Sequence, residues 1–145
     1  MVRGRSLLPE GRHDNKHRVS FADLLRDLVA SAKGARGAVF CGHDGEFVDL
    51  LVAQPQPSGC GDLTAYDLKV IGAHLAAPWR ALQDGSANGR TGAALEMGLR
   101  CNEGALLCAR LPEGYYLVLL LAPAAQVSPA FVALRRTAGR LAEHL

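Results

Sequence analysis

The chain has 145 residues, of which 49% are hydrophobic, and a formal net charge of +2 at pH 7. This length suits one domain with a single core, and the apolar content is typical of a globular protein rather than a disordered one. The charge is uneven, because residues 1–18 sum to +3 and residues 19–145 to −1. A nearly neutral folded part argues against a nucleic-acid surface, which needs basic side chains clustered on one face.

The sequence also bears on the compartment in which the protein works. The longest apolar run, from Tyr115 to Pro123, is far shorter than the roughly 20 residues that span a bilayer. The amino-terminal segment has arginines but no apolar stretch of the kind found in secretory signals. The four cysteines lack CxxC spacing, so buried, reduced thiols are expected. We therefore predict a cytoplasmic protein without a membrane span.

Residues 1–18 have no apolar period and are predicted to form a flexible basic tail ahead of one domain over residues 19–145. The simplest interpretation of this tail is a solvated leader. A contact with an acidic partner or a membrane surface is the alternative, although five scattered positive charges are few for that purpose.

The first half of the domain is predicted to be helix, strand, strand and helix. Ser20 caps a first helix that Gly34 ends, and an Asp44-Gly45 turn joins strands over 38–41 and 47–53. After a loop over 54–61, Thr64 and Asp67 form a capping box that starts a second helix. Pro78 should bend or break that helix one turn before its end.

The second helix is apolar on two sides, which suggests that it touches both its own sheet and a partner. One stripe is larger and is predicted to face the sheet, with Trp79 as a core anchor: Leu68, Ile71, Leu75, Trp79 and Leu82. The other stripe has smaller residues, and His74 within it is either a partner contact or an exposed histidine: Val70, His74, Ala77 and Ala81.

Three strands and a helix complete the domain. The strands are predicted over 93–100, 105–111 and 115–122, and the apolar run Leu117–Leu121 is typical of a central strand covered on both sides. Ser128 is predicted to cap the last helix, with Pro129 at its first position. The fold class is therefore α+β, with the order α-β-β-α-β-β-β-α.

With this order, the chain resembles the roadblock/dynein light chain family over residues 20–145. The residues that carry the resemblance are the first hairpin, the long helix from Ala65, the strand over 92–100, the glycine turn at Gly104 and the final helix after Ser128-Pro129. The resemblance implies a profilin-like fold, a five-stranded antiparallel sheet with helices on both faces. It also implies homo- or heterodimers with another roadblock protein and regulation of a small Ras-like GTPase, which in bacteria is of the gliding-polarity type.

The resemblance implies that dimers form through the second helix and the third strand. The residues themselves agree in part, because the strand over 93–99 could lie at a sheet edge, where unpaired amides invite another strand. Glu96 and Arg100 would then face a symmetry mate in crossed contacts, or would simply blunt the edge. The predicted dimer or partner interface consists of Val70, His74, Ala77, Ala81, Leu95, Glu96, Met97 and Arg100.

No catalytic signature is present, since the chain has no P-loop, no GxSxG elbow and no HExxH motif. Cys41 and His43 could offer two zinc ligands, with Cys101 or Cys108 completing a site, but isolated strand cysteines are usually small buried hydrophobes. We therefore predict no catalytic residue, cofactor or metal. A profilin- or PAS-like sensory module, with a small ligand enclosed by the sheet and the loop over 54–64, is the alternative to the adaptor.

Overall fold

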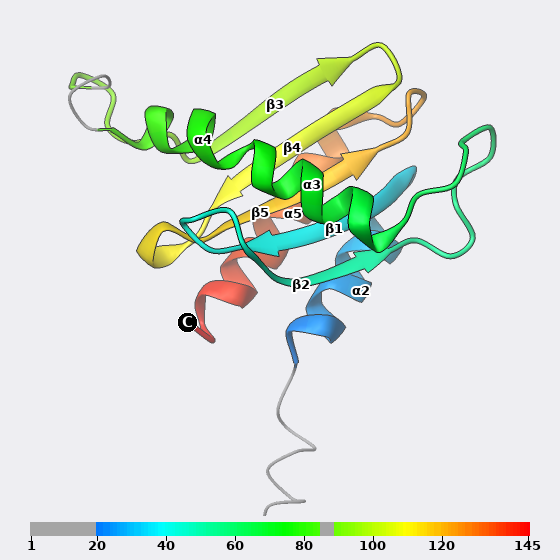
Figure 1. Cartoon of the computed structure of the whole chain (residues 1–145), viewed down its shortest axis with the longest axis horizontal. Helices are drawn as coiled ribbons and strands as arrows, with labels where there is room; N and C mark the ends of the chain where they lie inside the picture. The colour runs from blue at the N-terminus through cyan, green and yellow to red at the C-terminus, as the bar shows by residue number, and fades with distance from the viewer. Residues whose placement is uncertain (1–19, 85–88) are drawn as a thin grey trace, which may run out of the picture.

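The computed structural model describes residues 20–84 and 89–145, so the predicted tail over 1–18 and most of the loop over 85–89 lie outside the described residues. The predicted element order is confirmed, with the second helix divided in two (Figure 1). The elements are α2 (Phe21–Ser31), β1 (Ala35–Cys41), β2 (Phe47–Val52), α3 (Ala65–His74), α4 (Ala76–Gln83), β3 (Glu96–Cys101), β4 (Gly104–Arg110), the short 3₁₀ turn η1 (Pro112–Gly114), β5 (Tyr116–Leu121) and α5 (Val127–Ala142).

Three of the predicted local signals have the expected geometry. The Ser20 side chain accepts a hydrogen bond from the backbone N–H of Asp23 at 3.1 Å, at the start of α2. Thr64 and Asp67 form both hydrogen bonds of a capping box at the start of α3. In the first hairpin Gly45 has a φ of 88°, which favours glycine because it has no Cβ.

The predicted N-cap at Ser128 is wrong. Helix α5 begins at Val127 after Gln126, which makes no side-chain capping bond, so Ser128 and Pro129 occupy the second and third helical positions. The whole first turn of a helix has unpaired N–H groups, and proline therefore fits at more than one of its positions. Strand β3 also begins later than predicted, at Glu96 rather than at Ala93.

The second helix breaks as predicted, but at Leu75 rather than at Pro78. A proline ring clashes with the carbonyl four residues earlier, here that of His74, which is the last residue of α3. Pro78 itself lies in the first turn of α4, where its missing N–H has no helical acceptor. Trp79 is only 2% exposed, so the predicted role as a core anchor is confirmed.

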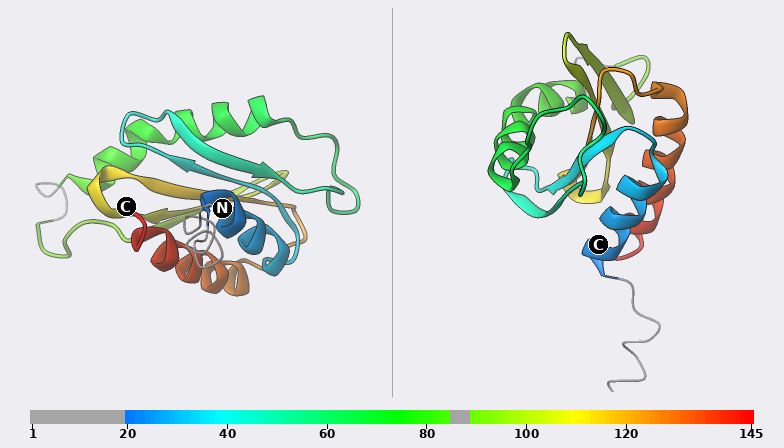
Figure 2. Two further views of the ribbon diagram at one scale, coloured as in Figure 1. Left: turned by 90° about the horizontal axis from the view of Figure 1, so that it is seen from below. Right: turned by 90° about the vertical axis from the view of Figure 1, so that its right-hand side faces the viewer.

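The five strands form one antiparallel sheet in the order β2-β1-β5-β4-β3, with β5 in the centre as predicted and β2 and β3 at the edges. Helices α2 and α5 cover one face and α3 and α4 the other (Figure 2). Each face has its own core. The larger lies under α2 and α5 and includes Leu28, Leu119 and Leu134, and the smaller lies under α3 and α4 and includes Leu68 and Val118.

In the described part of the chain, no helix has the length and apolar character needed to cross a bilayer.

Candidate functional site

Strand β3 is an open edge of the sheet, as predicted for this segment. It pairs with β4 on one side, and the backbone N–H of Arg110 donates to the carbonyl of Leu95 at 2.8 Å. Backbone groups alternate along a strand, so the odd-numbered residues of β3 point their N–H and C=O groups toward β4. Glu96, Gly98 and Arg100 therefore direct theirs toward the free edge, where another strand could pair with them.

Apolar side chains lead from this edge across the face that carries α3 and α4. Leu99 lies opposite Leu106 on β4, and Leu106 lies opposite Leu120 on β5; we call these three residues the Leu99 row. Helix α3 packs on β1 and β2, further along the sheet. Leu99 is therefore 46% exposed, and Leu106 and Leu120 are only partly buried. Met97 is partly buried beside the row.

The opposite face of β3 is attached to α5. The Nε of Arg135 donates to both carboxylate oxygens of Glu96, at 2.8 and 3.1 Å, and these bonds hold the pKa of that carboxyl below its usual range. Phe131 packs on Gly98, where an added Cβ would lie 3.1 Å from the ring. Arg100 makes no ion pair with the residues that the structure describes.

The predicted interface residues therefore fall into three groups. His74, Ala77 and Ala81 are exposed and Val70 is half-buried on α3 and α4, which cross the sheet face of the Leu99 row (Figure 1). Met97 lies on that same face, and Leu95, at 67% exposed, precedes β3. Glu96 and Arg100 lie on the opposite face of β3, so the eight residues do not form one continuous patch.

The end of α4 is joined to the chain just before β3. The side-chain amide of Gln83 donates to the carbonyl of Ala94 at 2.7 Å, and the backbone N–H of Ala94 donates to the carbonyl of Leu82 at 3.4 Å. These bonds bring the two predicted segments of the interface together. The sequence did not predict the partial exposure of Leu106 and Leu120, because exposure leaves no local pattern in the sequence. It also did not predict the contact between Arg135 and Glu96, which are 39 residues apart.

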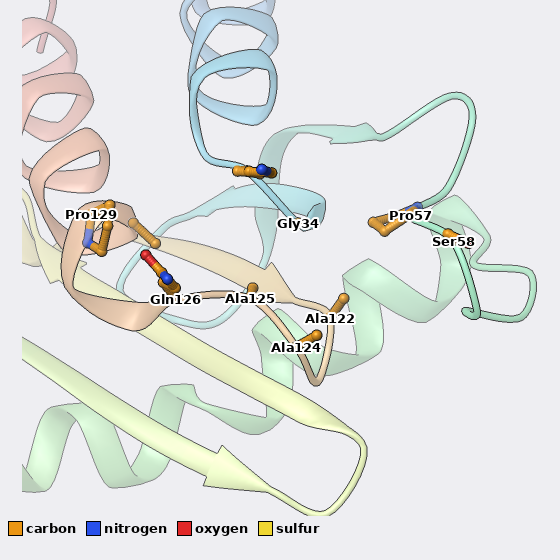
Figure 3. Close-up of a pocket in the computed structure, with 10 residues that line it drawn as sticks. Gly34, Pro57, Ser58, Ala122, Ala124, Ala125, Gln126 and Pro129 are labelled. Carbon is orange, nitrogen blue, oxygen red and sulfur yellow. The ribbon is translucent and has the colours of Figure 1, made fainter.

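A separate cavity of about 550 Å³ lies at one end of the sheet (Figure 3). The turn after α2, the loop before α3 and the start of α5 surround it, and small residues line most of it: Lys33, Gly34, Pro57, Ser58, Ala122, Ala124, Ala125, Gln126, Pro129 and Ala130. Arg36 holds the loop, since its Nε donates to Gln56 Oε1 at 2.7 Å and Gln56 Nε2 donates to the Arg36 carbonyl at 2.9 Å. The predicted ligand loop thus contributes Pro57 and Ser58 to the wall.

The cysteines differ in exposure. Cys41 and Cys108 are buried, and burial raises the pKa of the Cys41 thiol to about 11 and that of Cys108 to about 12. Cys101 is exposed and Cys60 is partly exposed. Among residues 20–84 and 89–145, no group of three or more His, Cys, Asp or Glu side chains is placed to hold a metal ion.

No protein-family model matches the chain, and no curated protein matches its sequence. Solved structures do match in fold. The gliding protein MglB from Thermus thermophilus aligns with a TM-score of 0.71 and 16% identity, over 98% of this chain and 96% of that one. A roadblock/LC7 domain from Streptomyces avermitilis aligns at 0.69 and 13%, over 83% and 93% of the two chains. MglC from Myxococcus xanthus aligns at 0.61 and 24%, over 88% and 100%. The chain has the roadblock, profilin-like fold.

Proposed function

We propose that this protein is a non-enzymatic, dimerising adaptor that regulates a small Ras-like GTPase in the cytoplasm, within a polarity or motility complex. The observation that carries the proposal is the free edge of β3 beside the uncovered Leu99 row. A strand added at this edge would gain backbone hydrogen bonds, and its apolar side chains would remove Leu99 from water.

The structural neighbours support the same class of function. MglB is a gliding protein, and a structure of MglB has a tetrameric arrangement. Such an assembly needs surfaces at which copies of the fold meet. In this chain the edge of β3 is suited to that purpose, and the exposed residues of α3 and α4 supply further contact area on the same side.

The non-enzymatic part of the proposal rests on the sequence, which has no nucleophile elbow, P-loop or metal motif. An effect on GTP hydrolysis would then come from reshaping the site of the GTPase itself. Arg135 and Arg140 contact Glu96 and Asp27 within the chain, so neither is presented as a free arginine finger.

The proposal is tested by immobilising the whole protein and passing native lysate over it with added GTP or GDP. We expect mass spectrometry to identify a small GTPase or a second roadblock protein, with retention of the GTPase dependent on the nucleotide. A Leu99→Asp variant should lose the second roadblock protein, and Val132→Asp, on the exposed side of α5, should retain both. Recovery of neither class of protein by the unmodified chain would contradict the adaptor.

The cavity beside Lys33 favours a second candidate, a sensory module that binds a small molecule. Its wall combines apolar alanines and prolines with a few polar groups, a composition that suits a small, mostly apolar ligand. Native mass spectrometry of the freshly purified protein tests this candidate. A bound molecule that is lost in the Ala124→Trp variant would support the sensory module. Detection of only the unliganded protein mass under gentle ionisation would count against it.

A further inference from the structure

We propose that Asp49 blocks strand addition at β2, the second free edge of the sheet, so that contacts between strand edges are restricted to β3. Strand β2 lies at the opposite end of the sheet from β3 (Figure 1). This inference rests on the proposed function only for the pairing at β3. It adds the residue that prevents pairing at the other edge.

Strand β2 has the composition of a segment that pairs readily with other strands. Its six residues, Phe47–Val52, read FVDLLV, and Asp49 is the only one among them that is not apolar. Phe47 and Val48 are 41% and 44% exposed. Short apolar segments that are rich in aromatic and β-branched residues, with little charge and no proline, associate edge to edge when their backbone is free. An edge strand of this kind therefore requires protection.

The backbone hydrogen bonds show which groups of β2 face the free edge. The N–H of Ala53, just after β2, donates to a carbonyl of β1 at 2.9 Å. Because the bonding alternates along antiparallel strands, Leu51 and Asp49 also direct their backbone groups toward β1. Leu50 and Val52 therefore direct their N–H and C=O groups outward, where a new strand would pair with them.

The outward N–H of Leu50 already has an acceptor. The carboxylate of Asp49 accepts it at 2.9 Å, in the position that the carbonyl of an added strand would occupy. The negative charge would also repel an approaching carbonyl oxygen. Just before Asp49, Val48 has no partner on β1, because the register shifts there. A bulge of this kind twists an edge away from a new strand, so two devices protect the same stretch of β2.

The position of Asp49 is unfavourable for any role in packing. It lies directly opposite Phe40, so its side chain is on the face of the sheet that carries the core under α2 and α5. The side chain is half-buried and makes no ion pair with the residues that the structure describes. Partial burial of an unpaired charge lowers stability. An inward-pointing charge on an edge strand is a known protection against pairing, which accounts for a carboxylate here.

The two edges of the sheet therefore differ. In β2 a neighbouring side chain accepts an outward N–H, whereas in the described part of the chain no side chain does so for the outward N–H groups of β3. A pair of copies joined at β3 would have a β2 edge at each end. Without Asp49, pairing at those edges would join such pairs end to end without closure, which produces filaments.

Asp49→Val in the whole chain tests the inference, because it removes the carboxylate and introduces a residue that favours strands. Asp49→Asn is the matched control, since its side-chain oxygen can still accept the N–H of Leu50. Glu46→Val, in the exposed loop before β2, makes the same change of charge away from the edge. In light scattering, Asp49→Val should reach a weight-average mass at least about twice that of the unmodified protein at equal concentration. Both controls should match the unmodified protein.

Amide hydrogen exchange distinguishes pairing at β2 from aggregation of unfolded chains. In the Asp49→Val assembly, the amides of Leu50 and Val52 should exchange more slowly than in the same variant at high dilution, because they become hydrogen-bonded to a second strand. Larger particles in which these two amides exchange no more slowly than in the dilute protein would overturn the inference.

The Leu99→Asp background separates the role of Asp49 from the pairing at β3. With β3 disabled, Asp49→Val should give pairs through β2 and no larger particles. If the unmodified protein is a monomer, the pairing at β3 is wrong, and dimers of Asp49→Val would still support protection of β2. If Asp49→Val has the size of the unmodified protein at every concentration, the role of Asp49 is wrong and the dimerising adaptor is unaffected.

Discussion

The hydroxyl of Tyr116, on the central strand β5, donates a hydrogen bond of 2.7 Å to the carbonyl of Gly72 on α3. Both residues are buried, and burial raises the pKa of Tyr116, so the hydroxyl stays protonated as a donor. The same carbonyl accepts the backbone N–H of Leu75 at the end of α3. The bond therefore attaches the sheet to the helix one turn before the break at Leu75.

Gly72→Ala should destabilise the protein by about 1–3 kcal/mol, because overpacking a filled core has this order of cost. An added Cβ would lie 2.7 Å from the sulfur of Cys41 and 3.2 Å from a methyl group of Val39. The clash outweighs the better helix propensity of alanine, which is worth about 1 kcal/mol. The free energy of unfolding from urea titration measures the effect.

Gly139→Ala is the matched control, since Gly139 is an exposed glycine in α5 with nothing within 4 Å of an added Cβ. We expect it to stabilise the protein by about 0.5–1 kcal/mol. If both variants shifted stability in the same direction, packing at Gly72 would not be the deciding factor.

Met97→Asp should weaken dimer formation more than about tenfold, because the carboxylate would be buried without a partner between two strands. Sedimentation velocity over a concentration series measures the change. Met97 is partly buried within one copy, so a circular dichroism melt must show that the variant is folded. Leu99→Asp, at a more exposed site, should have the same effect. Wild-type assembly in both variants would exclude this surface.

Arg100→Glu should also weaken the dimer, by roughly tenfold at low salt, because two pairs of opposite charges become pairs of like charges. The difference from the unmodified protein should shrink as salt is added, since exposed charges are screened. Arg136→Glu, an exposed arginine on α5, serves as the control and should dimerise normally. Equal dissociation constants for all three proteins would contradict the contact with Glu96.

The thiols should react in two classes. Cys41 and Cys108 are buried with pKa values raised to about 11 and about 12, so they remain protonated at pH 8. Cys60 and Cys101 are accessible. Titration with an aromatic disulfide reagent should therefore modify two thiols in the native protein and four after unfolding. Rapid modification of four thiols under native conditions would mean that the core under α3 opens readily.

The Glu96–Arg135 contact should make stability depend on pH in one direction. Because the pKa of Glu96 is lowered in the folded state, its contribution is present above the ordinary value of 4.5 and is lost as the pH falls through the lowered value. Melting temperatures of the unmodified protein and of Arg135→Ala should differ slightly near pH 7 and converge in acid. A difference that is constant down to pH 3 would argue against the pairing.

The sequence predicted local structure correctly where residues close together in the chain determine it. Ser20, the Thr64–Asp67 pair and Gly45 act on residues at most three positions away, so the starts of α2 and α3 and the first hairpin were predicted correctly. The break before Pro78 has the same local origin. The predicted N-cap at Ser128 was wrong because proline is accepted throughout the first turn of a helix. The Ser-Pro pattern therefore does not determine which position of that turn the proline occupies.

The candidate site depended on tertiary structure for the reverse reason. The edge position of β3 follows from the strand order across the whole sheet, and alternation along that strand separates Glu96 and Arg100 from Met97. Leu106 and Leu120 lie in segments that are apolar on both faces, so no sequence period distinguishes the covered side from the uncovered one. Only the placement of α3 over β1 and β2 leaves the Leu99 row in contact with water, because burial is a property of what packs above a residue.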